Sequence, residues 1–253
     1  MAAGLGTRLR PFTDHWPKCL MPVKGRPVLE YWLSVLHSSC IKNILVNIHH
    51  HADIVRNFLN RPVFHNLLEM VYEPELLGTA GTLRANADFF KDSTILLIHA
   101  DNLCDCDFQN FLDFHNNLRP SGTVMTMMTF ESQIPESCGI VEINEDGVVQ
   151  NFHEKIKNPP GNLANAAVYI IEPEVFDWIL ERPEVSDFST EVLPHFIGKI
   201  ATWKNDGVLR DIGTPEMLLA AQNDKCDIPI WPIDSSFKKF SNNPEYKKII
   251  HSL

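Results

Sequence analysis

Residues 2–24 of the chain read AAGLGTRLRPFTDHWPKCLMPVK, a loop-like segment with two glycines, a threonine and several basic side chains. Gly4 and Gly6 would let backbone amides approach a phosphate closely, because neither carries a Cβ atom. Arg8 and Lys18 add positive charge beside them. The whole chain carries a net charge of −10, so this local basic character is not a by-product of composition. The segment therefore predicts a loop that binds a phosphate-bearing ligand.

A glycine pair alone is weak evidence, because Gly-x-Gly also marks ordinary turns. The segment lacks both the third glycine of a dinucleotide-binding turn and the Gly-Lys-Ser/Thr of a P-loop. The complete run, Gly-x-Gly-Thr-Arg-Leu-x-Pro-x-Thr followed by Pro-Lys, resembles the signature of the sugar-1-phosphate nucleotidylyltransferases, and the resemblance extends over residues 2–223. It implies that Arg8 and Lys18 are catalytic. It also implies nucleotide contacts at Ala3, Gly4, Gly6 and Thr7.

Length and composition favour one large α/β domain or two small ones, since 44% of the 253 residues are apolar. The acidic balance argues against binding to nucleic acid or to an anionic membrane surface. No apolar run reaches membrane-spanning length, and no signal peptide is expected before the first motif. The cysteines are scattered, which predicts reduced thiols and a cytoplasmic location. They are Cys19, Cys40, Cys104, Cys106, Cys138 and Cys226.

Strand-like and helix-like segments alternate through the first half of the chain, as in a parallel sheet. Helices are expected at residues 27–39, 52–59, 107–117, 173–180, 189–198 and 214–223, with a loop and then a helix over 78–90. Strands are expected at residues 43–49, 69–73, 94–100, 122–130, 139–144, 147–152 and 165–172. Residues 144–147 look like the turn of a hairpin.

The resemblance implies a Rossmann-like, three-layer α/β sandwich of the nucleotide-diphospho-sugar transferase type, with a mixed central sheet that is mostly parallel. Family members carry a short apolar strand before Ala-Ala-Gly, so this sequence is expected to lack the first strand of that sheet. Residues 1–223 are expected to form the catalytic domain. Residues 224–253 are expected to form a helical C-terminal extension that packs on the same domain.

Two aspartates far apart in the sequence are candidate metal ligands. Asp101 ends the apolar run 94–100, and open α/β sheets bind ligands at the carboxyl ends of such strands, although a turn or a helix N-cap fits its position equally well. Asp211 precedes Thr214, which itself has the signature of a helix N-cap, so capping does not account for Asp211. The resemblance implies that both aspartates bind Mg²⁺ and that Asp101 also contacts the nucleotide.

A second glycine-rich segment, LGTAGT at residues 77–82, leads into a helix, and a plain helix entry is its alternative interpretation. The resemblance places Gly78 and Gly81 beside the nucleobase. The segment is most similar to that of guanylyl-transferring members that act on mannose-1-phosphate, while members that use other bases carry close variants.

The resemblance also implies contacts to the sugar phosphate from Gly139, Glu154, Lys155 and Asn165. By itself, Glu154-Lys155 would be an ordinary surface pair. Many members have a proline next, where this chain has Ile156.

Two clusters of metal-ligating residue types do not predict a metal site. Residues 49–51 are three consecutive histidines, which cannot face one point on a strand or helix, so a strand-to-helix junction is expected there. Cys104 and Cys106 have no partner cluster of the kind that zinc requires.

The resemblance implies that an NTP and a sugar-1-phosphate give an NDP-sugar and pyrophosphate with the help of Mg²⁺. No general base is expected, because a phosphate monoester is already ionised near neutral pH. Catalysis would rest on positioning and charge stabilisation. A non-catalytic NDP-sugar-binding subunit is one alternative. A glycosyltransferase on a similar fold is another, since Asp105 and Asp107 have the Asp-x-Asp spacing. Mannose-1-phosphate with GTP is the first choice, and the sugar, the base, the presence of residues before Met1 and a homo-oligomeric state stay open.

Overall fold

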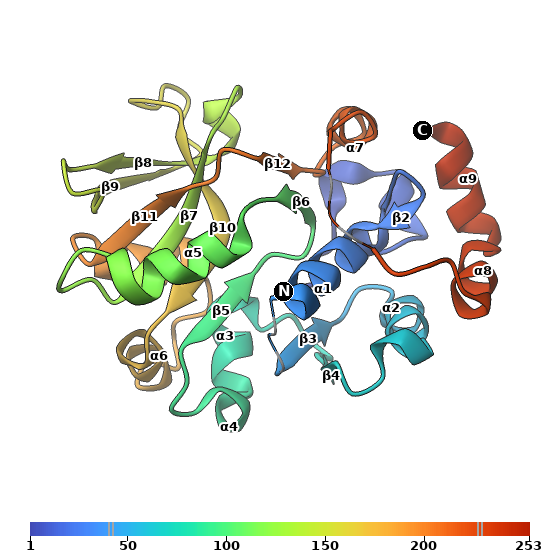
Figure 1. The fold of residues 1–253 in the computed structure, drawn as a ribbon, viewed down its shortest axis with the longest axis horizontal. Helices are drawn as coiled ribbons and strands as arrows, with labels where there is room; N and C mark the ends of the chain where they lie inside the picture. The colour runs from blue at the N-terminus through green and yellow to red at the C-terminus, as the bar shows by residue number, and fades with distance from the viewer. Residues whose placement is uncertain (40, 42, 227, 229) are drawn as a thin grey trace. The chain divides into compact units, whose positions relative to one another are not determined.

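The structure, a computed structural model, describes residues 1–39, 41, 43–226, 228 and 230–253. It divides into two compact units, and each unit is built from segments that are separate in the sequence (Figure 1). The first unit comprises Met1–Leu76, His99–Cys106 and Gly207–Leu253, and the second comprises Leu77–Ile98 and Asp107–Asp206. No helix that the structure describes is long and apolar enough to cross a membrane.

The first unit starts with three short 3₁₀ turns, Thr7–Leu9, Phe12–Asp14 and Lys18–Leu20, and no strand precedes β1 in its described residues. Its strands form three two-stranded sheets. These are antiparallel β1 (Pro22–Val23) with β2 (Arg26–Pro27), parallel β3 (Ile44–Ile48) with β4 (Leu68–Tyr72), and antiparallel β6 (Asn102–Asp105) with β12 (Val208–Asp211). Its helices are α1 (Val28–Ser38), α2 (Ala52–Leu59), α7 (Pro215–Ala221), α8 (Ser235–Ser241) and α9 (Pro244–Ser252).

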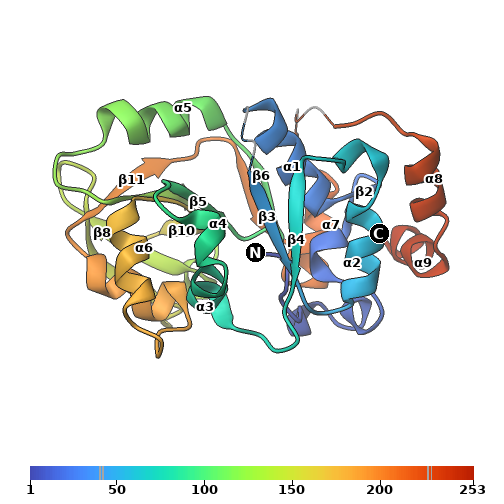
Figure 2. The same cartoon turned by 90° about the horizontal axis from the view of Figure 1, so that it is seen from below.

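The second unit is built on a six-stranded sheet in the order β11-β7-β10-β8-β9, with β5 also paired to β10. The strands are β5 (Ile95–Ile98), β7 (Met125–Glu131), β8 (Gly139–Ile143), β9 (Val149–Glu154), β10 (Leu163–Ile171) and β11 (Ile200–Lys204). The helices are α3 (Gly78–Ala85), α4 (Ala87–Phe90), α5 (Phe108–Asp113) and α6 (Pro173–Leu180). Figure 2 shows α5 on one face of this sheet and α3 and α6 on the other, so the sheet is covered on both faces.

The mixed α/β class is confirmed, but the expectation that parallel pairs would predominate is not met. β10 runs antiparallel to β5, β7 and β8, whereas the parallel pairs are β7 with β11 and β3 with β4. The physical reason lies in the connections. β8, β9 and β10 follow one another through links that are too short for the crossover that a parallel neighbour requires.

Most expected elements are present with close boundaries, and α2 and α6 coincide with the predicted ranges 52–59 and 173–180. Two expectations are corrected. α3 begins at Gly78 itself, so the loop lies before residue 78 and not within the range 78–90, and the predicted helix over 189–198 is instead a π turn (Phe188–Val192) followed by a 3₁₀ turn (Leu193–Phe196). Pro194 explains the second correction, because it has no N–H to continue an α-helical ladder.

Candidate active site

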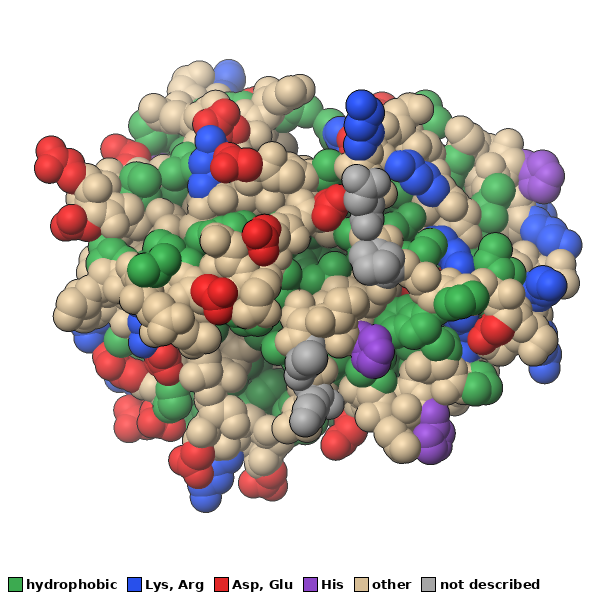
Figure 3. Space-filling view, in the orientation of Figure 1, with side chains coloured by type: hydrophobic (Ala, Val, Ile, Leu, Met, Phe, Trp, Pro, Cys, Tyr) green, Lys and Arg blue, Asp and Glu red, His purple; other side chains and the backbone are tan. Residues whose placement is uncertain are grey.

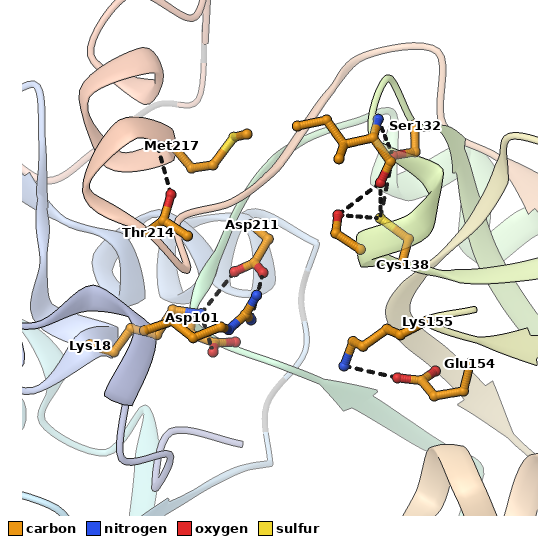
Figure 4. A network of polar contacts seen from close by, with 12 residues as sticks. Lys18, Asp101, Ser132, Cys138, Glu154, Lys155, Asp211, Thr214 and Met217 are labelled. Atoms are coloured by element: carbon orange, nitrogen blue, oxygen red, sulfur yellow. Dashed lines mark hydrogen bonds and ion pairs between the residues drawn. The ribbon is translucent and has the colours of Figure 1, made fainter. Parts of the chain in front are cut away.

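The antiparallel pairing of β6 with β12 brings Asp101 and Asp211 together. Asn102 lies opposite Asp211 in this ladder, and Asp101 directly precedes Asn102. Both carboxylates reach the same atom, because Lys18 Nζ lies 2.7 Å from Asp101 Oδ2 and 2.8 Å from Asp211 Oδ1 (Figure 4). Three residues from distant parts of the chain therefore converge on one point of the first unit.

Lys18 is the buried member of this group. Its side chain is 9% exposed, against 30% for Asp101 and 49% for Asp211. Burial would lower the pKa of Lys18, but the two carboxylates outweigh it and hold the pKa above its usual value. Burial would likewise raise the pKa of Asp101, but Lys18 and His99 outweigh it and hold that pKa below its usual value. Lys18 and Asp101 are thus charged across the neutral range.

Arg8 extends the cluster towards solvent. Its Nη2 atom lies 3.3 Å from Asp211 Oδ2, and its side chain is 59% exposed, so most of its hydrogen-bonding capacity faces outwards. Gly213 lies against both groups. A Cβ atom at Gly213 would be 2.8 Å from Asp211 Oδ2 and 3.0 Å from Arg8 Nη2. The Asp211 carboxylate therefore has room in its position because residue 213 has no side chain.

The glycine loop precedes this cluster and is held by Thr13. Gly6 has a φ of 63°, which a residue with a side chain rarely adopts, and its carbonyl accepts a 2.8 Å hydrogen bond from Thr13 Oγ1. A Cβ atom at Gly6 would be 2.8 Å from Thr13 Cγ2 and 3.1 Å from Lys18 Cβ. Gly4 and Thr7 are exposed, and Ala3 is buried. The loop thus packs closely against the Cβ atom of Lys18 at Gly6, while the backbone at Gly4 is exposed and accessible to a ligand.

The three histidines at residues 49–51 lie between β3 and α2, as the sequence predicted. His50 Nε2 and His51 Nε2 lie 3.1 Å and 3.3 Å from the carbonyl oxygen of Thr13. His50 and His51 therefore contact Thr13, the residue whose hydroxyl holds the Gly6 carbonyl.

The donor set of the first unit fits a hard divalent cation. Two carboxylates that reach one point supply the oxygen ligands that Mg²⁺ prefers. No group of three or more His, Cys, Asp or Glu side chains is placed to hold a metal among the residues that the structure describes. A cation at Asp101 and Asp211 would therefore take its other ligands from water or from a substrate.

The expected sugar-phosphate residues lie in the second unit. Gly139 on β8 pairs with Glu154 on β9, and a Cβ atom at Gly139 would be 2.7 Å from Glu154 Oε2. Lys155 Nζ lies 2.9 Å from Glu154 Oε1, and the Lys155 side chain is 57% exposed (Figure 4). Gly139, Glu154 and Lys155 thus form one local group, and Glu154 is held close to the β8 backbone.

Asn165 lies at an irregularity of β10 in the second unit. The register to β7 shifts between Asn165 and Tyr169, where Ala167 has a φ of 56°. Asn165 Oδ1 accepts a 2.9 Å hydrogen bond from the Ala167 amide, and Asn165 Nδ2 donates to the Tyr169 hydroxyl at 2.6 Å. Tyr169 is fully buried, and burial raises its pKa above the usual value. The hydroxyl therefore stays protonated and fixes the Asn165 side chain.

The second glycine segment is tied to a neighbouring loop of the same unit. Gly78 has a φ of 75°, and a Cβ atom there would be 2.4 Å from the Ser186 carbonyl oxygen. That oxygen also accepts from the amides of Ala80 and Gly81, at 2.8 Å and 3.3 Å. These two amides already donate to the Ser186 carbonyl, so other groups of this segment would have to recognise a nucleobase.

Three residues that the sequence interpretation did not select are important to the site: Thr13, Tyr169 and Gly213. Thr13 lies in the segment 2–24 and Gly213 lies between Asp211 and Thr214, so both could have been selected from the sequence motifs. No sequence pattern pointed to Tyr169, because its hydrogen bond to Asn165 depends on the irregularity in β10. Two residues that the sequence interpretation named serve as helix caps. Thr214 caps α7 through its bond from the Met217 amide, and Asp107 caps α5.

One cysteine contacts the group around Glu154, since the backbone carbonyl of Cys138 accepts a 3.1 Å hydrogen bond from the Lys155 amide. The five cysteines that the structure describes are thiols without disulfide bonds, and Cys40 lies outside the described residues. Burial raises the pKa of the Cys19 thiol to about 12, so Cys19, which follows Lys18, is not a nucleophile at neutral pH.

Comparison with proteins of known sequence gives consistent matches. A mannose-1-phosphate guanylyltransferase catalytic subunit beta from Drosophila pseudoobscura pseudoobscura is 29% identical over 225 residues, which are 87% of this chain and 59% of the relative. A mannose-1-phosphate guanylyltransferase from Mycobacterium tuberculosis is 30% identical over 85% of this chain and 60% of its own length. The chain thus spans about three-fifths of the length of the curated relatives it matches.

Solved structures show the same fold. A Bacillus anthracis protein assigned as a glucose-1-phosphate thymidylyltransferase, in complex with sucrose, superimposes with a TM-score of 0.80 at 22% identity, covering 94% of this chain and 96% of that one. HddC from Yersinia pseudotuberculosis superimposes with a TM-score of 0.73 at 24% identity, covering 87% and 95%. The sequence model of the nucleotidyl transferase family matches residues 1–227. The chain therefore belongs to the nucleotidyl transferase family.

Proposed function

We propose that this protein transfers a nucleotidyl group from an NTP to a sugar-1-phosphate, giving an NDP-sugar and pyrophosphate. The observation that carries the proposal is the convergence of Lys18, Asp101 and Asp211 on one point, with Arg8 beside them. A reaction between two polyanions needs such a concentration of charged groups. The guanylyltransferase relatives make GTP and mannose-1-phosphate the first substrates to test.

In the first unit, we assign the triphosphate to the glycine loop and the Lys18 cluster. Arg8 and the open backbone at Gly4 bind the leaving pyrophosphate, and Lys18 stabilises the charge that develops on the α-phosphoryl group. Mg²⁺ held by Asp101 and Asp211 would neutralise phosphate charge. In the free protein, Lys18 Nζ lies between the same two carboxylates, and this contact with a positive group supports the assignment of a cation to this point.

In the second unit, we assign the sugar-1-phosphate to the group around Glu154. Lys155 presents an exposed ammonium for the attacking phosphate, while Glu154 and Asn165 offer acceptors and donors for sugar hydroxyls. No residue is needed as a general base, since the attacking phosphate oxygen carries its own charge at neutral pH. We further propose that the enzyme works in the cytoplasm.

The test is a matrix of the four NTPs against a panel of sugar-1-phosphates, with pyrophosphate release as the readout. We expect Mg²⁺-dependent release for at least one pair, and loss of release in Asp101→Asn with the fold intact. Asp105→Asn is the matched control, because Asp105 lies on the same short strand, away from the Lys18 cluster. Release at the normal rate in Asp101→Asn would refute the metal assignment. Binding of an NDP-sugar without any turnover would refute catalysis itself.

A further inference from the structure

Residues 228–253 lie outside the part of the chain that matches the family, yet they form two helices within the first unit, α8 and α9. The outer faces of these helices carry exposed lysines, namely Lys238 and Lys239 on α8 and Lys247 and Lys248 on α9 (Figure 3). Their inner faces carry the aromatic side chains Phe237, Phe240 and Tyr246. The helix pair is therefore amphipathic, and its apolar side is covered by the unit to which it belongs.

The apolar side of the helix pair packs on Trp16, which lies two residues before Lys18. Trp16 is fully buried, and its ring centroid lies 5.3 Å from that of Tyr246 and 5.7 Å from that of Phe240. Trp16 Nε1 donates a 2.9 Å hydrogen bond to the Leu20 carbonyl, across the turn that contains Lys18. One indole thus joins the C-terminal helices to the turn that holds the Lys18 ammonium.

Two further contacts fix the helix pair to the same region. The Tyr246 hydroxyl donates to the Gly25 carbonyl at 3.1 Å, at the tip of the β1–β2 hairpin that follows the Lys18 turn. Arg26 lies over the Phe237 ring at 4.2 Å and donates a 2.6 Å hydrogen bond to the Trp231 carbonyl. The segment from Trp16 to Arg26, which includes Lys18, is therefore contacted at both ends by residues from the C-terminal helices or the chain leading to them.

Arg26 and Arg61 belong to a buried charge cluster that anchors α8. Glu30 has no exposed side-chain surface, and its Oε1 atom lies 3.2 Å from Arg26 Nη1 and 3.5 Å from Arg61 Nη1. Asp234, the N-cap of α8, lies 3.7 Å from Arg61 Nη2. Because the loss of a partner would leave a buried charge uncompensated, this cluster stabilises Arg61 beside the residue at which α8 begins.

We infer that Tyr246 and Phe240 are positioning residues for Lys18, so that the C-terminal helices act as a brace that holds the phosphate-binding loop in its reactive shape. This inference rests on the proposed function for its kinetic consequence. It does not rest on that function for its structural consequence, which is the rigidity of residues 7–20. A catalytic ammonium displaced by about an ångström can cost up to about a hundredfold in rate, so a modest loosening of the brace is measurable.

The test compares Tyr246→Leu and Phe240→Leu with Tyr246→Phe in the full-length chain. Amide hydrogen exchange reports the protection of residues 7–20, and steady-state kinetics report kcat and KM separately. We expect both leucine variants to increase exchange over residues 7–20 and to lower kcat about tenfold, with the KM for the sugar-1-phosphate changed less than about twofold. Tyr246→Phe keeps the ring against Trp16 but removes the hydrogen bond to the Gly25 carbonyl, so it should fall between the wild type and Tyr246→Leu in both measurements.

Phe176→Leu is the control variant, which should lower the stability of the protein without displacing Lys18. Phe176 is buried in α6 of the second unit, with its ring 6.0 Å from that of Phe90. It should lower the unfolding temperature while leaving kcat and the exchange of residues 7–20 unchanged.

The inference is overturned if Tyr246→Leu and Phe240→Leu retain wild-type exchange over residues 7–20, or if Phe176→Leu lowers kcat as much as they do. Should the wild type turn over none of the nucleotide and sugar phosphate pairs, the proposed function fails. The exchange data would then decide the positioning role by themselves.

Discussion

Lys18 is the most constrained residue of the candidate site, because its ammonium lies between two carboxylates in a largely buried position. In the free protein it neutralises the two side chains that we assign to Mg²⁺. A Mg²⁺ ion that binds there must therefore compete with the Lys18 ammonium for the two carboxylates. This arrangement predicts that the free protein binds divalent cations weakly and that Lys18 sets that weakness.

Replacement of this lysine separates its two roles. Lys18→Met should raise the affinity of the nucleotide-free protein for Mn²⁺ by about tenfold or more, because one competing positive charge at hydrogen-bond distance is removed. The same variant should lose about two orders of magnitude in turnover, as when a preorganised electrostatic group is lost. Electron paramagnetic resonance of free Mn²⁺ measures the first effect, with Lys91→Met at an exposed position as the control. Equal or weaker Mn²⁺ binding by Lys18→Met would contradict this account.

The pKa of Asp101 gives a second measurement at this scale. In the wild type it lies below the usual value, so the ionised carboxylate stabilises the fold at pH values above about 4, and that stability is lost as the pH falls through the native pKa. In Lys18→Met, burial is no longer outweighed by the ammonium, so the pKa of Asp101 should move upwards. An NMR titration of the Asp101 carboxyl carbon checks the direction. A pKa that stays below the usual value in this variant would mean that Lys18 is not the dominant influence.

Gly213 supports a prediction that depends on space alone, because its backbone is not in the left-handed region. In Gly213→Ala the new Cβ atom would lie within 3.0 Å of both Asp211 carboxylate oxygens, so we expect the carboxylate to be displaced from its present position beside Lys18. We expect a loss of about tenfold to a hundredfold in turnover with the fold intact. Gly161→Ala is the matched control, since a Cβ atom there meets nothing within 4 Å. Equal turnover in the two variants would show that the position of Asp211 is not critical.

At the level of elements, the sequence predicted what depends on local patterns. α6 starts with Pro173 at its first position, and α7 follows the Thr214 cap, so both helix starts were visible in the residues themselves. β6 and β12 were not predicted. Each has only four residues, and β12 includes Arg210 and Asp211, so neither shows the apolar run of a core strand. The pairing that joins the two aspartates was therefore reachable only through the family resemblance.

The start of α3 offers a test of the contact between Gly78 and Ser186. Gly78 has a φ of 75° and Gly122 has a φ of 83°, but only at Gly78 does an added Cβ atom meet another group, the Ser186 carbonyl oxygen at 2.4 Å. Gly122→Ala should cost about 1–2 kcal/mol in the free energy of unfolding, the strain of a left-handed residue. Gly78→Ala should cost clearly more, because the carbonyl that caps α3 must also move. Urea unfolding of both variants measures the difference, and equal losses would exclude a role for the Ser186 contact.

For the whole molecule, the division into units follows from how the chain is routed. The second unit is continuous from Leu77 to Asp206 apart from the short excursion His99–Cys106, which carries Asp101 and β6 into the first unit. The first unit draws on three segments, and its core depends on all of them. Trp16 packs against Phe240 and Tyr246, and β6 pairs with β12. Phe240, Tyr246 and β12 all follow residue 206 in the sequence.

This routing predicts that the two parts of the chain differ in their ability to fold alone. A fragment of residues 77–206 retains every strand of the six-stranded sheet together with α3 to α6, so it should show dispersed amide NMR signals and a cooperative urea transition. A fragment of residues 1–106 loses β12 and the rings that bury Trp16, so it should lack both properties. A folded 1–106 fragment would mean that the phosphate loop is stable without its C-terminal partners, and the positioning role of Tyr246 would fall with it. An unfolded 77–206 fragment would mean instead that the second unit does not fold without residues 1–76 and 207–253 of the first unit.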